Sequence, residues 1–243
     1  MADAPRITGR KAAPGGARMK CVASPTLFTI GHSTHSIEEF IALLRAHAVA
    51  RIVDVRSIPK SRHCPQFNID AMPGWLEQAG IGYAHLKALG GRRHSRRDSL
   101  NTGWRNTSFR GYADYMGTSE FAAGLNELVA MASERPTAIL CAEAVPWRCH
   151  RSLIADAMAV RGWDVREIMS AAPARQHKLM PFLKVVEGRL TYPGQPEVQE
   201  KLGVLRRALE AGEESGAAKG DLVNEVRERL RGRAKHTGSK KVV

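Results

Sequence analysis

The stretch AILCAEAVPWRCHRSLIADAM, residues 138–158, joins two apolar segments through a turn that is rich in reactive side chains. The first segment, TAILCAE at 137–143, is a continuous apolar run, which is typical of a strand whose sheet is covered on both faces. The second, RCHRSLIADAMAVRG at 148–162, has the features of a helix that ends at Gly162. A buried strand that leads into a helix is the repeating unit of a parallel α/β sheet.

The same alternation of strands and helices continues on either side of this stretch. We expect further strands at 27–33, 50–59, 81–89 and 163–169, and helices at 36–48, 72–80 and 111–134, the last broken near Gly117. Ser36 and Glu39 have the spacing of a capping box at the start of the first helix. The sequence therefore predicts an α/β fold with a mainly parallel β-sheet flanked by helices, followed by a small β-hairpin at 182–194 that turns at Glu187 and Gly188.

Composition divides the 243 residues into one domain and two tails. Residues 1–25 are basic and rich in proline and glycine, which predicts a disordered arm. Residues 26–195 are long enough to form a single α/β domain with its own core. Residues 196–243 are charged and helix-prone, and we interpret them as a tail rather than a second domain.

Charge and cysteine content indicate the partner and the compartment. The chain has 37 Lys and Arg against 24 Asp and Glu, a net charge of +13. This excess favours an anionic partner such as a nucleotide or nucleic acid, although solvated surface charge gives the same balance. No apolar run approaches the roughly 20 residues of a membrane helix. The N-terminus lacks the apolar core of a secretory signal, and four cysteines without framework spacing fit a reducing compartment, so we expect a cytoplasmic protein.

Three of the predicted strands end in chemically reactive groups. The first strand supplies Gly31, His32 and Ser33, and the second supplies Asp54, Arg56 and Ser57. The fourth supplies Cys141 and Glu143 and, across the turn, Cys149, His150 and Arg151. Ligands of an open parallel sheet bind beyond the carboxyl ends of its strands. We therefore expect these side chains to share one rim, with His32, Asp54, Glu143, Cys149 and His150 as candidate catalytic residues. Arg56 and Arg151 are candidates for binding phosphate. Asp54 and Arg56 face the same side of a strand, so Asp54 either pairs with Arg56 or orients a histidine.

The cysteines allow more than one interpretation. Cys149 falls in the first turn of the predicted helix, where the macrodipole and a neighbouring arginine can lower a thiol pKa, which makes it a candidate nucleophile or redox thiol. The competing interpretation is a cysteine that merely packs in the core. A divalent metal held by Cys141, Glu143, Cys149, His150 and His32 is less favoured, because Cys-x7-Cys is not a usual spacing of structural zinc sites. We predict no cofactor, and a Cys141–Cys149 disulfide is disfavoured in the cytosol.

The segment 90–110 is a long polar loop in which arginines alternate with aromatic residues. Arg92, Arg93 and Arg105, with Trp104 between them, suit a phosphate backbone and stacked bases. Long loops without secondary structure are uncommon unless they are functional or disordered. The alternative is a solvated loop whose Trp104 packs back on the domain.

The motifs TIGHST, DVRSIP, LGGRR, GWRNTSFRGYADYM, CAEAVPWRCHRSLIA, HKLMPF and LTYPG resemble the family named Domain of Unknown Function 488 (DUF-488), from about residue 27 to 194. The resemblance implies a bacterial or archaeal cytosolic α/β protein and supplies no reaction. The motif positions that the resemblance implies as site residues are His32, Asp54, Arg56, Gly90, Gly91, Arg92, Tyr112, Tyr115, Cys141, Glu143, Cys149, His150 and Arg151. The segment IVDVRS is also similar to a strand of rhodanese-like domains, but the compact glycine-containing anion loop of that family is missing.

Three functions fit these observations. The first is an enzyme, a hydrolase or transferase, that acts on a nucleotide or nucleic acid. The second is a non-catalytic nucleic-acid-binding protein linked to DNA repair. The third is a cysteine-dependent sulfur-transfer or redox protein that uses Cys149.

Overall fold

A computed structural model describes residues 24–194, 203, 204 and 207, so the predicted arm at 1–25 and tail at 196–243 lie almost wholly outside the described residues. Six strands form one sheet in the order β3-β2-β4-β1-β5-β6, all parallel except the last. They are β1 (Thr26–Gly31), β2 (Arg51–Asp54), β3 (Gly82–His85), β4 (Thr137–Cys141), β5 (Asp164–Glu167) and β6 (Arg175–Gln176). A hairpin of β7 (Lys184–Val186) and β8 (Arg189–Thr191) follows. The predicted α/β fold with a mainly parallel sheet is confirmed.

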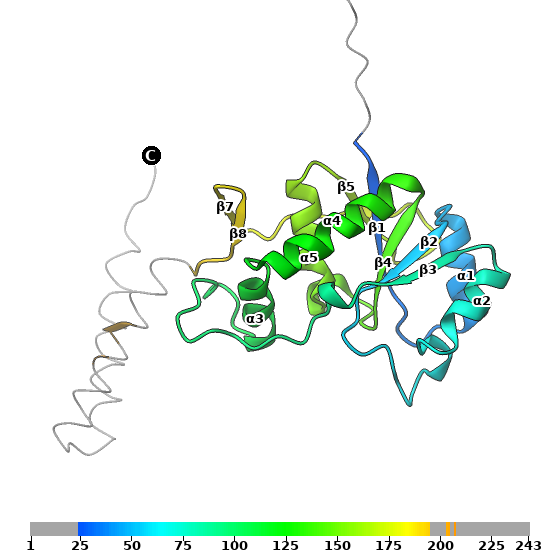
Figure 1. The fold of residues 1–243 in the computed structure, drawn as a ribbon, viewed down its shortest axis with the longest axis horizontal. Coiled ribbons are helices and arrows are strands. Elements are labelled where there is room, and N and C mark those ends of the chain that lie inside the picture. Colours follow the sequence, from blue (N-terminus) through cyan, green and yellow to red (C-terminus); the bar gives the residue numbers. More distant parts are fainter. Residues whose placement is uncertain (1–23, 195–202, 205–206, 208–243) are drawn as a thin grey trace, which may run out of the picture.

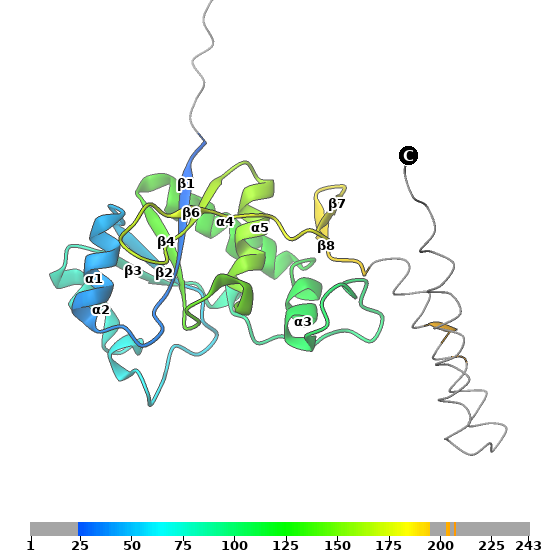
Figure 2. The ribbon, with the colours of Figure 1, turned by 180° about the vertical axis from the view of Figure 1, so that it is seen from behind.

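Helices cover both faces of the sheet (Figures 1 and 2). They are α1 (Ile37–Ala46), α2 (Met72–Gln78), α3 (Thr107–Tyr115), α4 (Ser119–Glu134) and α5 (Arg151–Val160). On one face α1 and α2 enclose a core with Phe40, Leu76 and Leu140, and on the other α4 and α5 enclose a core with Leu125 and Ile139. The neighbouring residues Ile139 and Leu140 enter opposite cores because side chains alternate along a strand. This explains the continuous apolar run that marks β4 in the sequence.

Local sequence signals set several element boundaries. Ser36 accepts from the Glu39 amide and the Ser36 amide donates to the Glu39 carboxylate, so the predicted capping box is present at α1. The helix expected at 111–134 is two helices, with Thr118 capping the second. Asn106 caps α3, which therefore begins earlier than expected. The hairpin turns at Glu187 and Gly188, as predicted, and both residues have positive φ.

The connections around β4 create a crevice at the carboxyl ends of the strands. β4 lies between β1 and β2, whose chains continue to α1 and α2 on one face. The chain after β4 continues to α5 on the opposite face. Loops that leave neighbouring strands in opposite directions open a space for a ligand between them.

Within the part of the chain that the structure describes, no helix has both the length and the apolar character needed to cross a membrane.

A buried carboxylate attaches the segment after β5 to α5. Asp156 is 0% exposed and accepts hydrogen bonds from His177 Nε2 at 2.9 Å and from the Tyr192 hydroxyl at 3.0 Å. His177 Nδ1 donates to Glu167 at 2.9 Å. Burial opposes a charge on this imidazole, but the bonds to the two carboxylates raise the pKa of His177 to about 9. His177 and Tyr192 thus attach the chain on either side of the final β-hairpin to Asp156 of α5.

Candidate functional site

A pocket of about 410 Å³ lies at the carboxyl ends of β1, β2 and β4, in the size range of small-molecule sites. Its lining brings together seven of the rim residues predicted from the sequence, namely His32, Arg56, Ser57, Cys141, Glu143, Cys149 and His150. Residues of the loops after β2 and β4 and of the segment 91–109 complete it. The convergence of separate chain segments that the parallel topology implies is therefore found at this end of the sheet.

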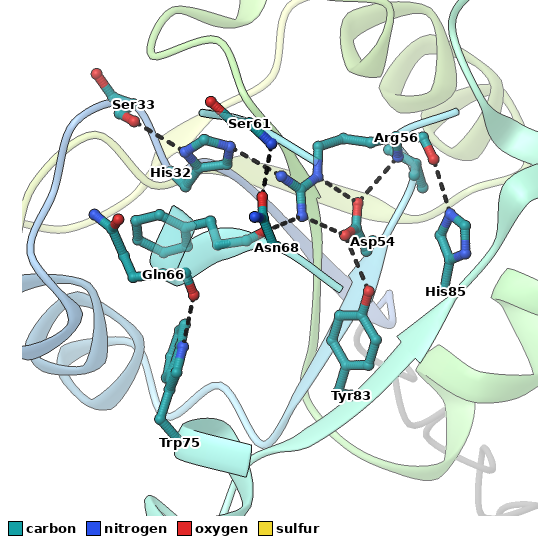
Figure 3. Close-up of polar contacts among 12 residues, drawn as sticks. His32, Ser33, Asp54, Arg56, Ser61, Gln66, Asn68, Trp75, Tyr83 and His85 are labelled. Atoms are coloured by element: carbon teal, nitrogen blue, oxygen red, sulfur yellow. Dashed lines mark hydrogen bonds and ion pairs between the residues drawn. The ribbon is translucent and has the colours of Figure 1, made fainter. Parts of the chain in front are cut away.

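Arg56 and Asp54 form a buried pair at the bottom of this rim (Figure 3). The Arg56 guanidinium donates to both carboxylate oxygens of Asp54, through Nε at 2.9 Å and Nη2 at 2.6 Å. It also donates to the Phe67 carbonyl at 2.7 Å, and Tyr83 donates its hydroxyl to Asp54. Of the two arrangements expected for Asp54, the structure has the pair with Arg56.

His32 is a fixed neutral imidazole beside this pair. Its Nε2 lies 3.1 Å from Arg56 Nη1, which can only donate, so Nε2 accepts and Nδ1 donates to the Ser33 carbonyl at 2.9 Å. Burial lowers the pKa of His32, and the Arg56 charge lowers it further. The ring also stacks on Phe67, with centroids 4.5 Å apart. Both nitrogens are thus engaged within the protein, and the ring lines the pocket without a free basic site.

Two thiols and an imidazole form a second cluster on the pocket wall. His150 Nδ1 lies 3.8 Å from Cys141 Sγ and 3.7 Å from Cys149 Sγ. His150 Nε2 lies 2.9 Å from the Val55 carbonyl, which can only accept, so Nε2 carries the proton and Nδ1 faces the sulfurs. The Cys141, Cys149 and His150 ligand atoms all lie within 4.8 Å of one another, an arrangement that could hold a metal ion. The cysteines that the structure describes, Cys64, Cys141 and Cys149, are all free thiols.

The electrostatics of the thiols differ from the sequence-based expectation. Burial raises the pKa of the Cys149 thiol instead of lowering it, and its hydrogen bond to Cys141 acts in the same direction. That hydrogen bond and the neighbouring His150 lower the pKa of Cys141. The expected lowering at Cys149 is therefore wrong, because the position that was assigned to an open helix start is only 3% exposed. Of the two thiols, Cys141 is therefore the more acidic.

Arg151 supports the loop after β4 from below. It is 1% exposed, and its guanidinium donates to the carbonyls of Glu143 and of Ala144, the latter at 2.9 Å. Its backbone amide donates to Cys149 Sγ at 3.5 Å. Arg151 is not among the residues that line the pocket. Its guanidinium therefore shapes the pocket wall and does not face the space where a ligand would bind.

The outer part of the pocket is cationic. Lys60, Arg92 and Arg148 line it with exposed side chains, and Glu143 is the carboxylate among the described lining residues. Phe109 contributes an aromatic face and stacks on Trp104, with centroids 4.8 Å apart. Cationic groups around a concave surface attract an anionic ligand.

Of the other residues predicted from the segment 90–110 and from the family motifs, Gly91 also lines the pocket, whereas Arg93, Trp104, Arg105, Tyr112 and Tyr115 are not among its lining residues. Arg93 lies over the Tyr115 ring at 3.5 Å, and Tyr115 and Tyr112 donate their hydroxyls to the carbonyls of Ala88 and Leu89. Burial raises the pKa of Tyr115 to about 12, so its phenol is neutral. Trp104 packs against Phe109, Phe182 and Tyr192, and Arg105 is exposed. These side chains mainly hold the loop on the domain.

Sequence reasoning missed several pocket residues. Lys60, Ser61 and Arg148 line the pocket and are not among the predicted candidates. A signal was available for some of them. Lys60 follows the second strand by a few residues and Arg148 precedes Cys149 directly, so both belong to loops at the predicted rim.

Among models of protein families, one described as "Domain of unknown function DUF488" matches residues 36–158, about half of the chain. The match begins at the cap of α1 and ends within α5, so it includes Arg56 and the cluster of Cys141, Cys149 and His150 but not His32. This match is shorter than the range from about 27 to 194 that holds the motifs resembling the family. No curated protein and no solved structure matches the chain.

Proposed function

Because the chain belongs to the DUF488 family, whose domain is described as being of unknown function, we propose a function from the pocket itself: it binds a phosphate-bearing ligand, a nucleotide or a nucleic acid. The observation that carries this proposal is the charge of the outer pocket. Three exposed cations, Lys60, Arg92 and Arg148, surround the opening, and Glu143 is the carboxylate that opposes them among the described lining residues. Their field favours an anion, and phosphate contacts supply most of the affinity for nucleic acids.

The local contacts keep these cations available. Lys60 pairs with Asp70 at 3.5 Å on the exposed surface, where such a pair stabilises by at most about 1 kcal/mol and yields readily to a ligand. The Arg92 amide donates to Ser57 Oγ at 3.1 Å, which positions the loop beside the pocket. Phe109 adds an aromatic surface against which a base can stack, a contact of about 1–3 kcal/mol.

Glu143 is the side chain that best suits acid–base chemistry on such a ligand. It is exposed, lies on the pocket wall and belongs to the loop that leaves β4, two residues after Cys141. A carboxylate within reach of a bound phosphate ester can activate water or protonate a leaving group. We therefore assign Glu143 the role of general acid or base in a hydrolytic or transfer reaction. His32 positions Arg56, because both of its ring nitrogens are engaged.

Binding can be tested by fluorescence anisotropy with labelled single-stranded DNA and RNA and with a labelled adenine nucleotide, at several salt concentrations and with the full chain. We expect the affinity for the single strands to fall with salt, and Arg92→Ala and Arg148→Ala each to reduce the salt slope by about one. Arg161→Ala is the matched control, because Arg161 is an exposed arginine at the opposite end of α5. Equal losses in all three variants would show that binding follows net charge, not the pocket.

Catalysis is tested separately. A Glu143→Gln variant that binds like the wild type but no longer converts the ligand, as judged by product analysis, supports an enzyme. Unchanged ligand with both proteins supports the non-catalytic nucleic-acid-binding alternative.

A further inference from the structure

We propose that Cys141, Cys149 and His150 form a binding site for a transition-metal ion, with Zn²⁺ the preferred occupant, and that its open coordination position faces the pocket. The site joins the last residue of β4 to the residues that precede α5. The proposal goes beyond ligand binding and does not depend on it, because the metal can be measured with no nucleotide present.

The distances within the cluster match tetrahedral coordination. Zinc bonds of about 2.3 Å to sulfur and 2.0 Å to nitrogen, at the tetrahedral angle, separate sulfur from nitrogen by about 3.5 Å. His150 Nδ1 lies 3.8 Å from Cys141 Sγ and 3.7 Å from Cys149 Sγ. The third pair, the two sulfurs, is within 4.8 Å. Only small side-chain adjustments separate this arrangement from one that encloses an ion.

The histidine is oriented as a metal ligand. Its Nε2 proton is donated to the Val55 carbonyl at 2.9 Å, which fixes the tautomer and directs the Nδ1 lone pair toward the sulfurs. Metal-binding histidines generally donate their second nitrogen in this way. Gly91 packs against the ring so closely that a Cβ at that position would collide with it. The imidazole is therefore held in place before any ion binds.

The surroundings also suit metal-bound thiolates. Cys141 and Cys149 are 7% and 3% exposed, and the Arg151 amide donates to Cys149 Sγ. Two thiolates neutralise a divalent ion, so the complex carries no net charge that burial would penalise. Sulfur and imidazole ligands select zinc and similar metals over magnesium and calcium.

The number of ligands indicates an open position. Structural zinc sites have four protein ligands, whereas catalytic sites have three and leave a place for water or substrate. Cys141, Cys149 and His150 all line the pocket, so a ligand can reach an ion held there from the pocket side. The Cys-x7-Cys spacing argued against zinc in the sequence, since it lacks the paired short spacing of structural sites. A site with three ligands at a strand-to-helix junction does not need that spacing.

The test uses the full chain, reduced and stripped with a chelator, and titrates it with Zn²⁺ in competition with a chromogenic chelator and with Co²⁺ as a spectroscopic substitute. We expect about one ion per chain, with thiolate-to-Co²⁺ charge-transfer bands and the strong visible absorption of a tetrahedral site. Loss of a residue that only hydrogen-bonds to a metal ligand typically lowers metal affinity by about 10–100-fold. Cys141→Ser and Cys149→Ser each remove a ligand, so each should weaken Zn²⁺ and Co²⁺ binding by more than that. His150→Ala should do the same.

Cys64→Ser is the matched control, because Cys64 is a buried thiol outside the cluster that donates to the Ser33 carbonyl at 3.4 Å. It should bind Co²⁺ like the wild type. Thiol titration of the wild-type protein, with and without Zn²⁺, gives a readout that does not depend on a variant folding. Zn²⁺ should protect two thiols. Co²⁺ binding in Cys141→Ser with the affinity and band intensity of the wild type would overturn the proposal, because the ion would then be held elsewhere. A wild-type protein that shows no such bands would also overturn it, in favour of a metal-free thiol pair.

Discussion

The Asp54–Arg56 pair shows how a buried charge can be structural and still shape a site. Asp54 is 0% exposed, and each of its carboxylate oxygens accepts a hydrogen bond from the Arg56 side chain. Breaking such a pair leaves an uncompensated charge in the interior. We expect Asp54→Asn to lower the free energy of unfolding by about 3–5 kcal/mol, measured by urea denaturation.

Tyr83→Phe is the control for this prediction, because it removes a single hydroxyl that donates to the same carboxylate at 3.1 Å. It should cost about 1 kcal/mol. Similar losses in the two variants would mean that the ion pair contributes no more than one neutral hydrogen bond.

His177 gives the protein a pH-dependent stability. Its pKa is raised from 6.5 to about 9 in the folded state, so the folded protein binds this proton more tightly than the unfolded chain does. The stabilisation is complete below about pH 6.5 and is lost as the pH rises through 9. We expect the difference in unfolding free energy between the wild type and His177→Gln to shrink over this range. The groups that face the imidazole are Asp156 and Glu167, with the Tyr192 hydroxyl on the same carboxylate.

Thermal unfolding monitored by circular dichroism at pH 6, 7.5 and 9.5 measures this difference. A gap between the two proteins that stays constant across these pH values would show that His177 is not charged in the folded state.

At the level of single residues, the sequence reveals which groups are reactive but not which partners they find. Asp54 and Arg56 were recognisable as a same-face pair because strand geometry is local. The interaction of His177 with Asp156 was not, since it joins α5 to a segment beyond the last parallel strand. The pKa of Cys149 was predicted with the wrong sign because burial is a property of the packed domain and outweighs the local helix position.

At the level of elements, the loop after β3 is fitted to the start of α5 through one glycine. A Cβ at Gly91 would overlap the His150 ring, whereas a Cβ at Gly74 in α2 would meet nothing within 4 Å. We expect Gly91→Ala to lower the melting temperature and to weaken Co²⁺ binding, because His150 is displaced. Gly74→Ala should stabilise by roughly 0.5–1 kcal/mol, because alanine favours a helix over glycine.

Differential scanning calorimetry of both variants, together with the Co²⁺ titration, tests the pair. Shifts of the same sign would contradict the assigned contact between Gly91 and the imidazole.

Helix boundaries that are set by residues close together in the sequence could be predicted. The capping box at Ser36 and Glu39 and the break near Gly117 depend on neighbouring residues and are present. β6 was missed because it has two residues, both exposed, and pairs antiparallel with the edge strand β5. Nothing in so short a polar stretch distinguishes a strand from a loop.

At the level of the whole molecule, the sheet should be most stable at its centre. β4 pairs on both sides, with β1 and β2, and is buried along its full length, whereas β6 is an exposed edge. In hydrogen exchange we expect the amides of Ile139 and Leu140 to open only in global unfolding and those of Arg175 and Gln176 to exchange much faster. Equal protection of β4 and β6 would contradict this order of stability.

The overall architecture follows from the alternation of strands and helices, and so does the location of the pocket, because carboxyl ends of parallel strands share one edge. What the sequence could not provide is the depth of each side chain. Arg151 and Tyr112 are chemically suited to phosphate but are fully buried, while Lys60 and Arg148 are exposed at the opening. That division depends on how the loops pack over the strand ends.

The loop that connects β4 to α5 has an evolutionary consequence. Residues 142–148 form a short bridge whose two ends are anchored, one by the pairing of β4 and the other by α5. Its exposed side chains, such as Glu143 and Arg148, can therefore change without altering the pairing of the strands. Exchanging this bridge between relatives offers a route to redirecting which molecules the scaffold accepts.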